Sequence, residues 1–142
     1  MIKKILVASD GSKHAFRAAE KALEMTKQLG EGVSVTLCHI VSKPISRGEL
    51  IHSKFDVKSL LENEAHQALI RIELLFRNEN VPFNLHVAMG EAAEEIIQKA
   101  NMENYDLVIV GSRGLNKLKE LVIGSVSREV AHGAWCPVMI VK

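Results

Sequence analysis

The sequence predicts an α/β domain built on a five-stranded parallel sheet with helices on both faces. Short runs of strand type alternate along the chain with segments whose apolar residues recur at helical spacing, which is typical of this class. The most apolar of these runs, Leu107 to Val110, is typical of a parallel strand that is buried on both sides. A length of 142 residues with 47% apolar and 25% charged residues fits a single domain over residues 1–142.

The first half of the chain predicts two strands and one helix. A first strand over 5–8 runs into Ser9-Asp10-Gly11-Ser12, which has the residues of a turn and a helix cap. Alanines at helical spacing predict a helix between Ser12 and Gly30, and alternating Val, Thr and Leu residues predict a second strand over 33–41. Residues 42–55 contain Pro44 and Gly48, so they form a long connection with room for a helical turn, and their role stays open.

The second half continues the alternation of helices and strands. Apolar residues from Val57 to Phe76 fit one long amphipathic helix, which must end before Val81-Pro82. The elements expected after it are a strand over 84–88, a helix over 93–100, a strand over 107–110, a short helix to Gly133 and a strand over 138–141.

The strongest functional motif is a pair of glycine clusters after the most apolar run of the chain. Gly111-Ser112-Arg113-Gly114 is separated by nine residues from Gly124-Ser125-Val126-Ser127. Glycines allow a tight turn whose backbone N–H groups converge on an anion, and a helix that opens at Gly124 would add its positive dipole end. The motif predicts a phosphate site; the alternative is a turn with a purely structural role.

Other residues at the ends of strands complete this site. Asp10, Gly90 and Gly111 each lie just past a predicted strand, and Ile40 lies at the end of one. Ligands of open parallel sheets bind beyond the carboxyl ends of the strands, where the strand order reverses. We therefore expect Asp10 and the glycine clusters to share one crevice.

Three better known phosphate motifs fit the chain less well. A P-loop requires a lysine before its Ser or Thr, whereas Gly124 precedes Ser125. The dinucleotide fingerprint is absent, because Asp10-Gly11 carries a single glycine. A phospho-acceptor receiver domain needs an acidic pair after the first strand and an acid after the third, and this chain offers only Asp10 and Gly90.

Composition argues against several other classes. A formal charge of +1 and scattered basic residues give little support for nucleic-acid binding. No run approaches the roughly 20 apolar residues of a membrane span, and no secretory segment is evident, so we expect a cytoplasmic protein that binds no membrane. The six histidines form no i, i+4 pair, so no metal site is expected, and Cys38 and Cys136 are expected to be reduced thiols.

The order of these motifs resembles the universal stress protein family, in its ATP-binding branch. The similarity extends over essentially the whole chain and is carried by residues 5–12, 37–41, 90–96, 106–114 and 124–138. The resemblance implies a sheet in the order 3-2-1-4-5, of the adenine nucleotide alpha hydrolase-like kind. It also implies a homodimer joined through the apolar last strand, Val138 to Val141.

The resemblance further implies an adenine-nucleotide site for ATP, or for ADP or AMP, with or without Mg²⁺. Asp10 would contact the ribose, and Ile40 with Ala8 would contact adenine. The phosphates would be held by the residues of the two glycine clusters, namely Gly111, Arg113, Gly114, Gly124, Ser125, Val126 and Ser127.

Three functions remain open at this stage. The chain could be an ATP-binding stress-response or regulatory protein, a slow ATP hydrolase, or a nucleotide-free dimeric interaction protein. Apart from distant groups such as His14, the rim offers no base for hydrolysis, so no catalytic residue is assigned and binding is favoured.

Overall fold

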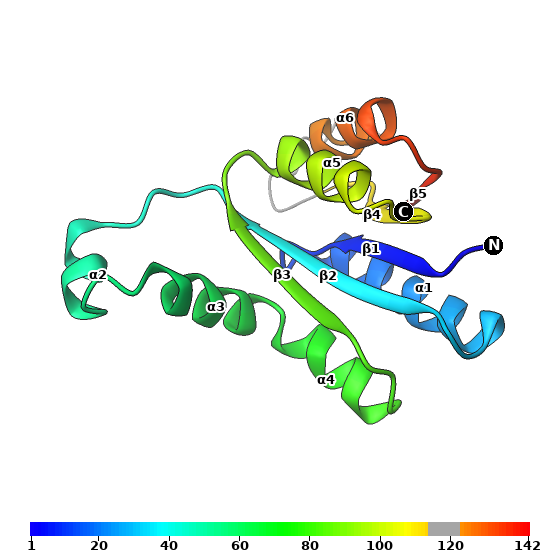
Figure 1. Ribbon diagram of the computed structural model, residues 1–142, viewed down its shortest axis with the longest axis horizontal. Coiled ribbons are helices and arrows are strands. Elements are labelled where there is room, and N and C mark those ends of the chain that lie inside the picture. Colours follow the sequence, from blue (N-terminus) through cyan, green and yellow to red (C-terminus); the bar gives the residue numbers. More distant parts are fainter. Residues whose placement is uncertain (114–122) are drawn as a thin grey trace.

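One sheet of five parallel strands forms the centre of the molecule, as seen in a computed structural model that describes residues 1–113 and 123–142. The strand order is β3-β2-β1-β4-β5, which confirms the fold class and the order expected above (Figure 1). β1 is central because it pairs with both β2 and β4. The strands are β1 (Lys4–Ala8), β2 (Ser34–Val41), β3 (Asn84–Met89), β4 (Leu107–Gly111) and β5 (Val138–Val141).

Helices cover both faces of the sheet, and successive side chains of β1 divide between the two cores. Ile5 and Val7 point into the core that contains α1 and α4, whereas Leu6 and Ala8 point into the core that contains α5 and α6. The helices are α1 (Lys13–Leu29), α2 (Arg47–His52), α3 (Val57–Ala68), α4 (Ile70–Asn78), α5 (Ala92–Met102) and α6 (Ser125–Gly133).

The expectation of one long helix from Val57 to Phe76 is wrong. The helix breaks at Leu69, whose backbone angles are φ −106° and ψ 11°. α3 contacts the edge strand β3, while α4 packs against α1. Because α3 and α4 pack against different elements, they cannot share one straight axis. No proline or glycine marks the break, and the buried Leu69 side chain is part of the core on the α1 face.

The connection between β2 and α3 contains the short helix α2. Ser46 caps it, because the Ser46 side chain accepts a hydrogen bond from the Glu49 N–H at 3.1 Å. None of the α2 residues is buried, and Figure 1 shows α2 standing away from the sheet at the end of an extended segment. Lys54 and Phe55 then take positive φ values of 58° and 63° before α3 begins.

Two features of the surface bear on partners. β5 is an edge strand whose four residues are all half-buried, and Trp135 just before it is 81% exposed. Among the described residues, no helix has the length and apolar character needed to cross a bilayer.

Candidate functional site

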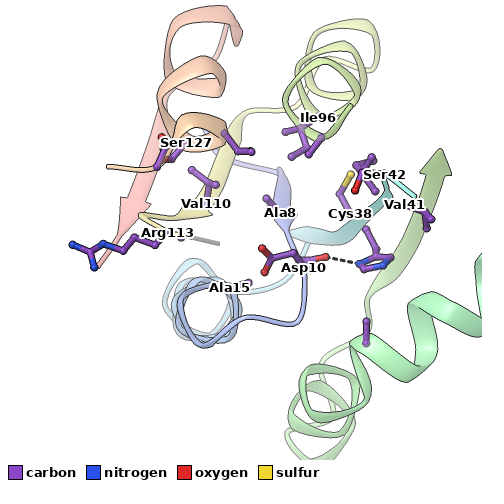
Figure 2. Close-up of a pocket in the computed structure, with 18 of the residues that line it drawn as sticks. Ala8, Asp10, Ala15, Cys38, Val41, Ser42, Ile96, Val110, Arg113 and Ser127 are labelled. Carbon is purple, nitrogen blue, oxygen red and sulfur yellow. Dashed lines mark hydrogen bonds between the residues drawn. The ribbon is translucent and has the colours of Figure 1, made fainter. Parts of the chain in front are cut away.

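A cavity of about 420 Å³ lies at the carboxyl ends of β1, β2 and β4, beside the start of α6 (Figure 2). This is where the strand order reverses, because the chain moves outward from β1 to β3 and then returns to β4 on the other side. The cavity brings together every predicted site residue that the structure describes: Ala8, Asp10, Ile40, Gly111, Arg113, Gly124, Ser125, Val126 and Ser127. Gly114 lies outside the described residues.

The turn after β1 fixes the Asp10 carboxylate at the rim of the cavity. One carboxylate oxygen, Oδ1, accepts the Ser12 N–H at 2.9 Å, and the Ser12 side chain in turn accepts the Ala15 N–H at 3.1 Å to cap α1. Gly11 allows the turn with its φ of +82°. The bond to Ser12 leaves the second oxygen of Asp10 for a ligand.

The wall on the α5 side of β1 and β2 is apolar. Ala8, Cys38, Ile40 and Ile96 line it, and all four belong to the core on the α5 face or pack against that core. Burial raises the pKa of the Cys38 thiol to about 12, so the thiol stays protonated and unreactive at neutral pH. Both cysteines are free, as expected. A flat apolar ring system is the kind of group that such a wall accommodates.

The start of α6 supplies hydrogen-bond donors on the opposite side. Gly124 is the residue before the helix, and no side chain caps this end. The N–H groups of Ser125, Val126 and Ser127 are therefore first-turn donors that lack acceptors within the helix, at its positive end. The Gly124 N–H is different, because it donates to the Ser112 carbonyl at 2.6 Å.

Two of the predicted ligand residues carry structural contacts of their own. The Ser127 hydroxyl, which is buried, can donate to the carbonyls of Gly124 at 2.9 Å and Ser112 at 3.3 Å, so it ties α6 to the end of β4. A Cβ on Gly111 would lie 2.7 Å from the Cβ of His14, which shows that a glycine here lets α1 approach β4 closely. Figure 2 shows the Arg113 side chain pointing away from Asp10 and the middle of the cavity.

Sequence reasoning assigned no ligand role to the remaining residues that line the cavity. Ser42 and Lys43 follow β2 directly, so their place at a strand end was a usable signal. The others come from α1, α3 and α5 or lie beside motif residues, and nothing local marks them: Ser9, Ala15, Cys38, His39, Val41, Glu64, Ala68, Ala92, Ile96, Val110 and Ser112.

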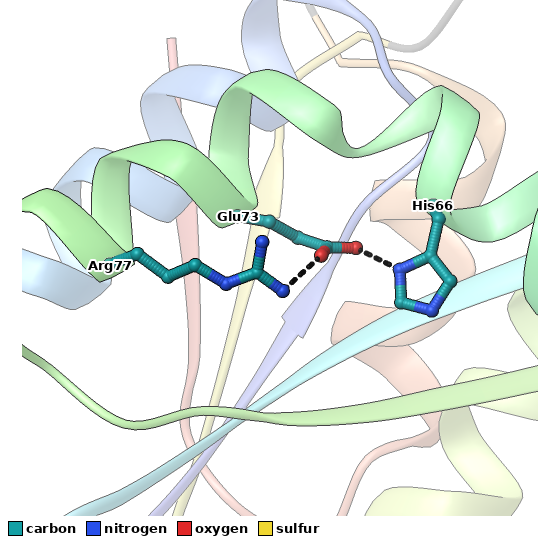
Figure 3. A network of polar contacts seen from close by, with 3 residues as sticks. All are labelled: His66, Glu73 and Arg77. Atoms are coloured by element: carbon teal, nitrogen blue, oxygen red, sulfur yellow. Dashed lines mark hydrogen bonds and ion pairs between the residues drawn. The ribbon is translucent and has the colours of Figure 1, made fainter.

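A second polar cluster lies at the break between α3 and α4 (Figure 3). The Glu73 side chain is only 4% exposed, and its two carboxylate oxygens contact His66 Nδ1 at 2.7 Å and Arg77 Nη2 at 3.1 Å. Because His66 lies on α3 while Glu73 and Arg77 lie on α4, the cluster joins the two halves. Within the described ranges, no group of His, Cys, Asp or Glu residues is arranged to hold a metal ion.

These features define an open parallel α/β domain with a ligand-sized cavity at its topological switch point. The chain belongs to the universal stress protein family, which matches residues 1–142. Universal stress protein YxiE of Bacillus subtilis is 28% identical over 150 residues, and the match covers 100% of both chains.

Two solved structures of the family extend the comparison. The Methanocaldococcus jannaschii protein MJ0577 is 30% identical, with a TM-score of 0.77 over 100% of this chain and 96% of the other. A universal stress protein from Archaeoglobus fulgidus, solved in complex with dAMP, is 21% identical, with a TM-score of 0.68 over 100% of this chain and 98% of the other. At that identity the second likeness supports the fold alone.

Proposed function

We propose that this chain binds an adenine nucleotide, with ATP as its ligand, and acts as a regulatory or stress-response protein of the ATP-binding branch of its family. One observation carries the proposal: the uncapped start of α6 lines the same cavity of about 420 Å³ as the Asp10 carboxylate. An anion-binding helix end and a ribose-binding carboxylate in one crevice suit a nucleotide. ADP and AMP are the alternatives within this class.

Each part of the nucleotide has a matching wall. We place adenine against Ala8 and Ile40, with the ribose hydroxyls donating to Asp10. The phosphates accept from the N–H groups of residues 125–127, and the backbone of residues 111–113 completes the cradle. Magnesium, if required, arrives with the phosphates, since this ion is usually held by one or two carboxylates plus the phosphate oxygens.

Binding is proposed rather than hydrolysis. The described residues that line the α6 end of the cavity are glycine, serine, arginine and valine, and none of them is a carboxylate or an imidazole that could take a proton from water. The Archaeoglobus fulgidus protein pairs the same fold with dAMP, which agrees with an adenine nucleotide as the class of ligand.

The phosphate end of the site is tested by a charge at Ser125. Ser125→Asp places a carboxylate on the first turn of α6, where negative charge favours the helix but repels phosphate. We expect isothermal titration calorimetry to show at least a ~10-fold loss of ATP affinity, about 1.4 kcal/mol, with no loss of thermal stability. Ser125→Asn is the neutral control of similar shape and should bind within a few-fold of the parent chain.

Two results would contradict the proposal. One is an unmodified chain that binds no adenine nucleotide and, after denaturation, releases none to mass spectrometry. The other is equal ATP affinity for the aspartate and asparagine variants, which would indicate that the phosphates do not bind at the start of α6.

We also propose that the chain forms a homodimer through β5. The Pro137 and Val141 carbonyls accept hydrogen bonds from N–H groups in β4 or just after it. Backbone groups alternate in direction along a strand, so residues 138 and 140 direct theirs to the free edge. An uncovered apolar edge of this kind favours pairing with a second strand.

Proline at position 140 tests the dimer. Ile140→Pro removes an N–H at the free edge without removing a β4–β5 bond, so light scattering at micromolar concentration should report the 15.7 kDa monomer. Ile140→Ala also shortens the side chain but keeps this N–H, and it should keep twice that mass. A monomeric mass for the unmodified chain would refute the proposal.

A further inference from the structure

We propose that His39 is a positioning residue that holds Asp10 in the orientation needed to bind the ribose of the ligand; this inference rests on the proposed function. His39 lies near the end of β2, lines the cavity and is only 6% exposed. Its Nδ1 atom lies 2.8 Å from the Ser9 carbonyl oxygen. A carbonyl can only accept, so Nδ1 carries the proton.

The Ser9 carbonyl needs this donor because the sheet ends there. Ser9 is 3% exposed. Its own N–H donates to the Cys38 carbonyl at 2.8 Å, which is the last backbone hydrogen bond between the end of β1 and β2. β1 stops at Ala8, so the Ser9 carbonyl lies beyond the strand pairing. A buried carbonyl without a donor is costly, and His39 supplies the donor from the neighbouring strand.

The peptide plane transmits this contact to Asp10. The Ser9 carbonyl and the Asp10 N–H belong to one planar peptide unit, so fixing the carbonyl fixes the direction in which the chain enters Asp10. On the other side, Asp10 Oδ1 accepts the Ser12 N–H at 2.9 Å. The Ser12 bond locks the side chain to its own turn, and the His39 bond locks that turn to the sheet.

Close packing leaves the turn little freedom once His39 holds it. A Cβ on Gly11 would lie 3.2 Å from the Ala68 carbonyl oxygen, so the turn runs against the end of α3. Without the imidazole, the Ser9–Asp10 peptide is expected to rotate toward another donor, and the free oxygen of Asp10 moves with it.

The preference for a ligand with ribose hydroxyls distinguishes a role of His39 in positioning Asp10 from a role in stability alone. Asp10 contacts only the ribose in the proposed complex, so its position affects the preference for ATP over 2′,3′-dideoxy-ATP. Tripolyphosphate contains no ribose and reports on the α6 end alone. Loss of stability would weaken both ligands, whereas misplacement of Asp10 weakens only the ribose-dependent part.

The experiment compares His39→Leu with His39→Asn by calorimetry. The asparagine amide nitrogen reaches close to the place of Nδ1 and keeps the donor, whereas leucine removes it. We expect the unmodified chain and His39→Asn to prefer ATP over the dideoxy analogue by about tenfold, and His39→Leu to lose most of that preference. Tripolyphosphate affinity should change by less than about twofold in all three.

Asp10→Ala allows a double-mutant cycle with His39→Leu. It should lose the same preference, and adding His39→Leu to it should remove nothing more, because both changes act on one contact. A His39→Leu chain that keeps its ribose preference overturns the inference, and so does an equal loss of ATP and tripolyphosphate binding.

A ligand-free measurement keeps the two proposals distinguishable. Long-range ¹H–¹⁵N correlation spectra of the unmodified chain should show the Nδ1–H form of His39. An Nε2–H form overturns the inference even if ATP binds. Conversely, an Nδ1–H form in a chain that binds neither ATP nor tripolyphosphate refutes the proposed function, and with it the ribose role of His39.

Discussion

Replacing Phe76 by alanine is expected to lower the free energy of unfolding by about 3–5 kcal/mol. Phe76 is fully buried between α4 and the sheet, and its ring meets that of Phe83 edge to face with centroids 5.7 Å apart. Truncation removes this contact and leaves a cavity that the surrounding side chains fill only in part. Urea denaturation followed by far-ultraviolet circular dichroism measures the change, because the exposed Trp135 is a poor reporter of the core.

Phe55 offers a matched control for this prediction. It is 70% exposed at the end of the α2 segment, so Phe55→Ala removes the same atoms without opening a cavity. We expect its effect to stay within about 0.5 kcal/mol at the same protein concentration. Similar losses for the two variants would mean that α4 does not pack on the sheet as described.

The second large effect is expected at Gly111. Gly111→Ala places a Cβ about 2.7 Å from the backbone carbonyl carbon and the Cβ of His14, in the first turn of α1. Backbone cannot yield as a flexible side chain does, so α1 must move away from β4, at a cost of about 1–3 kcal/mol. A lower urea midpoint with an unchanged slope is the expected result.

Gly48→Ala is the corresponding control. A Cβ there would meet nothing within 4 Å, and Gly48 lies inside the helix α2, where alanine is the better helix former. The expected change is zero or a slight gain in stability. If Gly111→Ala proves equally neutral, then α1 does not approach β4 as closely as described.

Much of the fold could be predicted because its signals are local. The strands are marked by short runs rich in apolar residues, and α1 carries its own cap residues, Ser12 and Gly30. The rim of the cavity followed from the same signals, since Asp10, Ile40 and Gly111 were placed by the ends of strands. The strand order, by contrast, came from the resemblance to a family and was confirmed by the structure.

The features that were missed depend on contacts between distant parts of the chain. Nothing in the residues around Leu69 favours a break, which arises because α3 and α4 pack against different elements. The sequence predicts Gly111 as a phosphate ligand, while its packing against His14 depends on the folded structure. In the sequence His39 is one of six dispersed histidines, and its contact with Ser9 exists only in the folded chain.

The exposed helix α2 is a position at which the chain could be cut into two fragments that reassemble. With no buried residue, this six-residue helix adds little to the cooperative core, and a short isolated helix is marginal in water. A break in the chain there would leave a fragment with β1 and β2 and a fragment with β3, β4 and β5. The fragments would still join along two strand pairs, β1 with β4 and β2 with β3, and would together rebuild the cavity. The connection is thus a natural place for a split reporter, in which reassembly of two separately made halves is read out by ligand binding.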